Sequence, residues 1–87
     1  MPTAASVAKF LKTNGIEVLS FQEGDEMVDG EVCLPNNLAV QVGDGLSLGY
    51  YDEAKEELCY IVMCGKKQDI LAALKSKATG KQFVAQQ

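Results

Sequence analysis

The sequence QVGDGLSLG, residues 41–49, contains three glycines after an apolar run, a pattern that can hold a phosphate group. A dinucleotide-binding loop has the spacing G-x-G-x-x-G between a strand and a helix, whereas Gly43, Gly45 and Gly49 have the spacing G-x-G-x-x-x-G. The other interpretation is a tight turn between two strands. A small-ligand or nucleotide-binding role for Gly43-Asp44-Gly45 is therefore one alternative, which depends on the elements that flank the loop.

The cysteines suggest two further kinds of chemistry, metal binding and nucleophilic catalysis. A structural zinc site takes its ligands from closely spaced cysteine or histidine pairs. Cys59 and Cys64 are five residues apart, so on a strand they point to opposite faces, and the chain has no histidine. We therefore predict no metal and no cofactor. Cys33 is the candidate reactive thiol, and the odd number of cysteines favours a reducing, cytoplasmic compartment.

Residue types on which many enzymes and nucleic-acid-binding proteins rely are missing. All eight basic residues are lysines, and the chain has no histidine. Histidine is the most common general base near neutral pH, and arginine recognises phosphate and guanine with two parallel hydrogen bonds. We therefore expect a non-enzymatic protein, and the composition disfavours direct nucleic-acid binding.

The charge is unevenly distributed along the chain. Residues 17–57 contain eleven acids and one lysine, a net charge of −10. Within them, residues 23–31 have five acids and no basic residue: Glu23, Asp25, Glu26, Asp29 and Glu31. Such a segment is commonly a solvated surface, and it would also suit a basic partner protein. An acidic inhibitor of a nucleic-acid-binding protein, encoded by a mobile element, is a further alternative.

Two amphipathic helices are predicted, one near each end of the chain. The first begins after Thr3, ends at Asn14-Gly15, and has an apolar stripe formed by Ala4, Val7, Ala8 and Leu11. The second extends from about residue 66 to residue 78 and ends before Gly80. Its apolar stripe consists of Ile70, Leu71, Leu74 and Ala78.

Five segments between the helices have β-strand character: residues 16–21, 31–34, 38–42, 46–51 and 58–64. A three-residue loop Gly43-Asp44-Gly45, with Gly45 left-handed, defines the register of the hairpin between the third and fourth segments. This register pairs Val42 with Leu46, Val40 with Leu48, and Leu38 with Tyr50. One face of the hairpin is then wholly apolar, so we predict that the glycines form a turn between strands.

The segment LCYIVMC, residues 58–64, is apolar at every position, which is typical of a central strand buried on both faces. Two helices can cover only one face of the sheet. We therefore expect Cys59, Ile61 and Met63 to face either a second copy of the chain or covering loops.

These observations predict a single α+β domain over residues 1–80, with residues 81–87 as a flexible tail. The domain has an N-terminal helix, a mainly antiparallel sheet of about five short strands and a C-terminal helix, with both helices on one face of the sheet. No apolar run approaches the roughly 20 residues that span a membrane. The favoured function is a small cytoplasmic protein-interaction domain that forms a homodimer through its sheet and binds an unidentified partner protein. The candidate interaction surface consists of the five acids of residues 23–31 together with Cys59, Ile61 and Met63.

Overall fold

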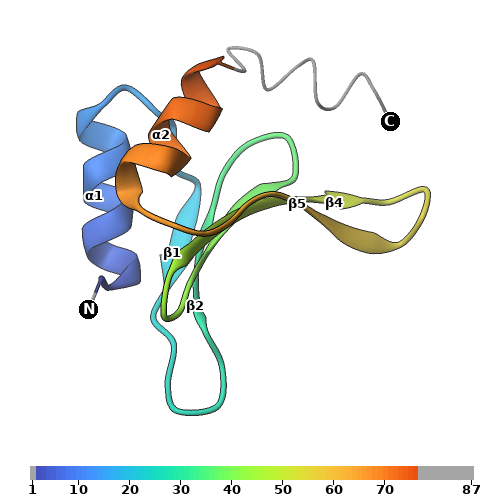
Figure 1. The fold of residues 1–87 in the computed structure, drawn as a ribbon, viewed down its shortest axis with the longest axis horizontal. Helices are drawn as coiled ribbons and strands as arrows, with labels where there is room; N and C mark the ends of the chain where they lie inside the picture. Colours follow the sequence, from blue (N-terminus) through green and yellow to red (C-terminus); the bar gives the residue numbers. More distant parts are fainter. Residues whose placement is uncertain (1, 77–87) are drawn as a thin grey trace.

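A computed structural model describes residues 2–76, which form two helices and a five-stranded sheet (Figure 1). The elements are α1 (Ala4–Thr13), β1 (Ser20–Gln22), β2 (Gly30–Cys33), β3 (Leu38–Val42), β4 (Leu46–Asp52), β5 (Glu57–Gly65) and α2 (Lys67–Ser76). The strands follow the order β1-β2-β3-β4-β5, and every neighbouring pair is antiparallel. The predicted α+β fold is therefore confirmed. The predicted tail, residues 81–87, and the predicted last residues of the second helix lie outside the described residues.

Helix α1 begins and ends at the residues that its sequence predicts. Thr3 and Ser6 form a capping box, in which each side-chain oxygen accepts a 3.0 Å hydrogen bond from the backbone N–H of the other residue. At the other end Gly15 has a φ of 84°, and the N–H of Ile16 donates to the carbonyl of Leu11 at 2.9 Å. This Schellman arrangement ends the helix. The predicted apolar stripe of α1 is buried.

The β3–β4 hairpin has the predicted register. Val42 pairs with Leu46, Val40 with Leu48, and Leu38 with Tyr50. Because the side chains of a strand alternate between its faces, this register places the apolar residues of both strands on the same side. The glycines are therefore part of a turn between strands.

The prediction that Gly45 is left-handed is wrong, because among the described glycines only Gly15 has a positive φ. Glycine is required at position 45 for a different reason. A Cβ atom there would lie 2.8 Å from the Cα of Cys64 on β5. The turn between β3 and β4 therefore lies directly against the backbone of β5.

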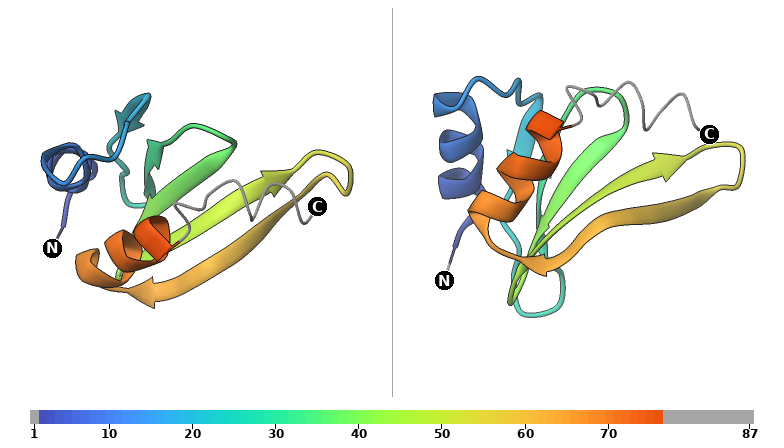
Figure 2. Two further views of the ribbon diagram at one scale, coloured as in Figure 1. Left: turned by 90° about the horizontal axis from the view of Figure 1, so that it is seen from above. Right: turned by 45° about the horizontal axis from the view of Figure 1, so that its top comes forward.

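Both helices pack on one face of the sheet, as predicted, and share one hydrophobic core (Figure 2). Helix α1 contacts β1 and β2, while α2 contacts β4 and β5. Ile70 is the described α2 residue that is fully buried. The strands contribute Val32, Val40, Val42, Leu46 and Leu48 to this core. The face that carries these residues is called the inner face, and the opposite one the outer face.

Strand β5 lies at the edge of the sheet, so the prediction that residues 58–64 form a central strand is wrong. The exposed fractions of Leu58, Tyr60 and Met63 are 38%, 43% and 67%. An unbroken apolar run is compatible with a doubly buried strand and also with an edge strand whose apolar side chains lack cover within one chain. The run alone could not separate these two cases.

Two irregularities interrupt the pairing of β5 with β4. Tyr60 pairs with Gly49 and Val62 pairs with Leu48, which leaves Ile61 as an additional residue on β5. The second irregularity lies between Val62 and Gly65, where Cys64 has a φ of 52°. Such bulges change the direction of side chains and increase the local twist of a strand.

Candidate functional site

The outer face of the sheet lies opposite α1 and α2, and no helix within residues 2–76 packs on it (Figure 2). The registers align one row of residues across four strands of this face: Cys33, Ala39, Gly49 and Tyr60. Tyr51 and Leu58 form the adjacent row. These two rows make an apolar surface that is partly exposed to solvent.

Tyr60 lies across the outer face, over Gly49. Its hydroxyl group donates a 2.9 Å hydrogen bond to Oε1 of Gln41 on β3. A Cβ atom on Gly49 would lie 2.9 Å from the carbonyl oxygen of Cys59 and 3.4 Å from the Tyr60 ring. Glycine at position 49 therefore avoids a clash with the backbone of β5, and the Tyr60 ring lies at van der Waals distance from this position. A tyrosine that is fixed in this way and still half-exposed is suited to anchor a protein contact.

The free edge of β5 is apolar in its middle and charged at its two ends. Residues 58–65 contain no charged side chain, while Glu56 and Glu57 precede them and Lys66 follows. All three charged residues are exposed. The segment from Glu57 to Lys66 is called the β5 edge. Among residues 2–76 no further strand pairs with this edge.

The three β5 residues that were predicted to share one face do not do so. Cys59 lies in the register of the inner face, and Ile61 packs against the hydrophobic core. Met63 is exposed. Leu58 and Tyr60 pair with Tyr51 and Gly49 and therefore lie on the outer face, and the additional residue at Ile61 interrupts the alternation before Met63.

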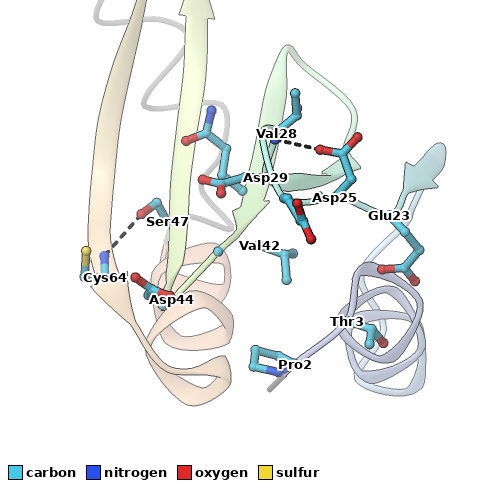
Figure 3. Close-up of a pocket in the computed structure, with 16 residues that line it drawn as sticks. Pro2, Thr3, Glu23, Asp25, Val28, Asp29, Val42, Asp44, Ser47 and Cys64 are labelled. Atoms are coloured by element: carbon cyan, nitrogen blue, oxygen red, sulfur yellow. Dashed lines mark hydrogen bonds between the residues drawn. The ribbon is translucent and has the colours of Figure 1, made fainter.

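A groove of about 580 Å³ lies between the β1–β2 loop and the β3–β4 turn (Figure 3). It brings the acidic segment and the glycine turn together, although they are far apart in the sequence. Five carboxylates line this acidic groove: Glu23, Asp25, Glu26, Asp29 and Asp44. Glu31, the remaining acid of the predicted surface, borders a second hollow beside the same loop. Four of the five predicted acids therefore meet at one place.

Glu23 connects the acidic loop to α1. Its two carboxylate oxygens accept hydrogen bonds from the backbone N–H groups of Ala4 at 2.8 Å and Ala5 at 2.9 Å. These N–H groups belong to the first turn of the helix, where an anion is favoured by the helix dipole. The carboxylate of Glu23 therefore occupies the helix end that borders the groove.

Asp25 stabilises the turn within the acidic loop. Its Oδ1 atom accepts hydrogen bonds from the N–H groups of Met27 at 2.8 Å and Val28 at 2.9 Å. These two donors hold the pKa of the Asp25 carboxyl below its ordinary value. The negative charge at Asp25 is thus part of the loop structure.

The surroundings of the glycine turn favour cations over phosphate. The turn joins two antiparallel strands and no helix follows it directly. A Cβ atom on Gly43 would lie 2.9 Å from both carboxylate oxygens of Asp29, which shows how closely this acid approaches the turn. Within residues 2–76, no three cysteine, aspartate or glutamate side chains are grouped closely enough to hold a metal ion. The groove therefore offers distributed negative charge.

Cys33, the candidate reactive thiol, is half-buried on the outer face of β2. Its Sγ atom lies 3.6 Å from Oε1 of Glu31, as the donor of a hydrogen bond. Reactive cysteines typically have a base or a cation nearby that favours the thiolate. The polar neighbour that the structure gives Cys33 is the acid Glu31, which is neither a general base of the usual kind nor a cation.

The chain matches no protein-family model, no curated protein and no solved structure. Neither helix within residues 2–76 combines the length and the apolar character that crossing a membrane requires.

Proposed function

We propose that this chain is a small, non-enzymatic protein-interaction domain of the cytoplasm that associates with itself through its sheet. The observation that carries the proposal is the apolar surface formed by the outer face and the β5 edge. On it, Leu58, Tyr60 and Met63 are exposed beside the half-exposed ring of Tyr51. Burial of such a surface against a second copy would remove apolar area from water on both partners.

The residue types on this surface also support a protein contact. Tyrosine and methionine are enriched at the centre of protein interfaces, from which charged residues are depleted. The row of Cys33, Ala39, Gly49 and Tyr60 contains no charge. A second copy of the same surface is the simplest occupant, because dimers with twofold symmetry are the most common protein oligomers.

Sedimentation equilibrium from about 1 μM to about 1 mM protein tests this proposal, since it covers micromolar to millimolar dissociation constants. We expect a mass that approaches twice 9.4 kDa at the higher concentrations. Met63→Ser should weaken the dimer. Met27→Ser is the matched control, because Met27 is also exposed but lies in the β1–β2 loop. A single species of 9.4 kDa at every concentration would contradict the proposal.

A second candidate function, binding of a basic partner protein, is favoured by the acidic groove. Glu26, Asp29 and Asp44 line this groove together with the carboxylates of Glu23 and Asp25. An acidic inhibitor of a nucleic-acid-binding protein would use such a surface, whereas a nucleotide phosphate would be repelled by it. Titration with oligolysine at about 50 mM and about 500 mM salt tests this alternative, because screening weakens exposed charge contacts. Glu26→Gln with Asp29→Asn should weaken binding, and Glu17→Gln with Asp69→Asn is the control of equal charge.

A further inference from the structure

We infer that the second copy binds antiparallel along the β5 edge, with a twofold axis between Ile61 and Val62, so that the two sheets become continuous. This inference rests on the proposed self-association and adds the partner's orientation and register. The juxtaposition that carries it is the opposite charge at the two ends of an otherwise uncharged edge strand.

The charges at the ends of the β5 edge select the antiparallel orientation. Glu57 is the first residue of β5, and Lys66 directly follows its last residue. In an antiparallel pair, Glu57 of each copy lies near Lys66 of the other copy. A parallel pair would place glutamate near glutamate and lysine near lysine, which is unfavourable across neighbouring strands.

The same axis also pairs the apolar side chains of the edge. Counting outward from the axis places Tyr60 of each copy opposite Met63 of the other, and the additional residue at Ile61 brings both positions to the outer face. Both residues are exposed in the single chain, and Tyr60 lies on the outer face. A methionine sulfur beside an aromatic ring is a favourable contact in proteins. The same register therefore places opposite charges near one another at the ends of the strand and apolar side chains opposite one another in its middle.

An edge of this length and composition, with which no further strand among residues 2–76 pairs, is a liability for a single chain. Strand β5 is nine residues long, and its apolar side chains are not interrupted by any charge. Soluble proteins usually protect such edges by charges, bulges or covering segments, because exposed edges pair with other strands. The two irregularities twist the strand, and a twofold pairing brings together two edges with the same twist.

Charge reversal at the ends of the β5 edge tests the inference. The dissociation constant of the full-length chain is measured by sedimentation equilibrium for Glu57→Lys, for Lys66→Glu and for the double variant. Each single variant places like charges together at two symmetry-related positions, and we expect roughly tenfold weaker dimerisation. The double variant restores opposite charges and should restore the affinity. Glu17→Lys and Lys9→Glu are the matched controls, because both residues are exposed and lie outside the sheet.

Each outcome separates the inference from the proposed function on which it rests. Restoration in the double variant supports the antiparallel register. A dissociation constant that is unchanged in all three variants would overturn this register. A double variant that dimerises as weakly as the single variants would do the same. Both results would leave self-association through the outer face intact. An unaltered chain that is monomeric throughout overturns both. Circular dichroism of each variant establishes that it is folded before its mass is interpreted.

Discussion

The carboxylate of Glu23 lies at the start of α1 and accepts a 2.8 Å hydrogen bond from the backbone N–H of Ala4. A second bond, from the N–H of Ala5, is 2.9 Å long. The acidic loop therefore caps α1, although Glu23 follows Ala4 by 19 positions in the sequence. Glu23 and Asp25 of the acidic loop therefore both have structural roles.

Replacement of Glu23 by alanine should destabilise the fold by about 1 kcal/mol, because two N–H groups of the first helical turn lose their acceptor. Urea denaturation of Glu23→Ala and of the unaltered chain gives this difference. Glu26→Ala is the control, since Glu26 lies in the same loop and the structure shows no hydrogen bond to its side chain. Equal losses in the two variants would show that Glu23 contributes only its charge.

Replacement of Gly45 by alanine should destabilise the fold by about 1–3 kcal/mol, the typical range for introduced overlap in a packed region. Its Cβ would lie 2.8 Å from a backbone atom of Cys64, which cannot move without disturbing β5. Gly43→Ala is the matched variant, because its Cβ would meet the Asp29 carboxylate, a group that can rotate away. The melting temperature of Gly45→Ala should therefore be lower than that of Gly43→Ala. The reverse order would contradict the close approach of the turn to β5.

Ile70 is completely buried and connects α2 to the core, so Ile70→Ala should destabilise the fold by about 2–5 kcal/mol. Leu71→Ala should have a smaller effect, because Leu71 is only half-buried. The change in the midpoint of urea denaturation compares the two variants. If Leu71→Ala lowered the stability as much as Ile70→Ala, α2 would have to be rotated relative to the packing described.

The stability of the acidic loop should depend on pH through Asp25. The pKa of this carboxyl is lowered in the folded chain, so its stabilising contribution is complete above the unfolded pKa of about 3.9. The contribution is lost as the pH falls through the lower, folded value. An NMR titration of the Asp25 carboxyl should give a midpoint below the ordinary aspartate value. A midpoint at or above the ordinary aspartate value would exclude the two N–H bonds in solution.

Features that depend on neighbouring residues could be predicted from the sequence. The cap at Thr3 and the end of α1 at Gly15 are encoded within a few residues of each helix end. The hairpin register followed from the period-two spacing of apolar residues on both sides of the glycines, because a shift by one residue would have exposed all of them. These local patterns were sufficient for α1 and for the β3–β4 hairpin.

Features that depend on distant pairs could not be predicted in this way. The contact between Glu23 and α1 joins residues that are 19 and 18 positions apart. The need for glycine at position 45 arises from Cys64, which belongs to a different strand. The position of β5 at the edge and the additional residue at Ile61 changed which side chains reach the outer face. The sequence alone therefore could not show which β5 side chains lie on the outer face.

The sequential strand order has a consequence for how the chain folds. Each strand pairs with the strand that precedes it, so the sheet forms from a series of hairpins without any connection that crosses over another strand. Closing short loops costs little chain entropy, and proteins with low contact order fold faster than those that depend on distant pairings. We therefore expect rapid folding for a chain of such high strand content, with the β3–β4 hairpin as a favourable starting point.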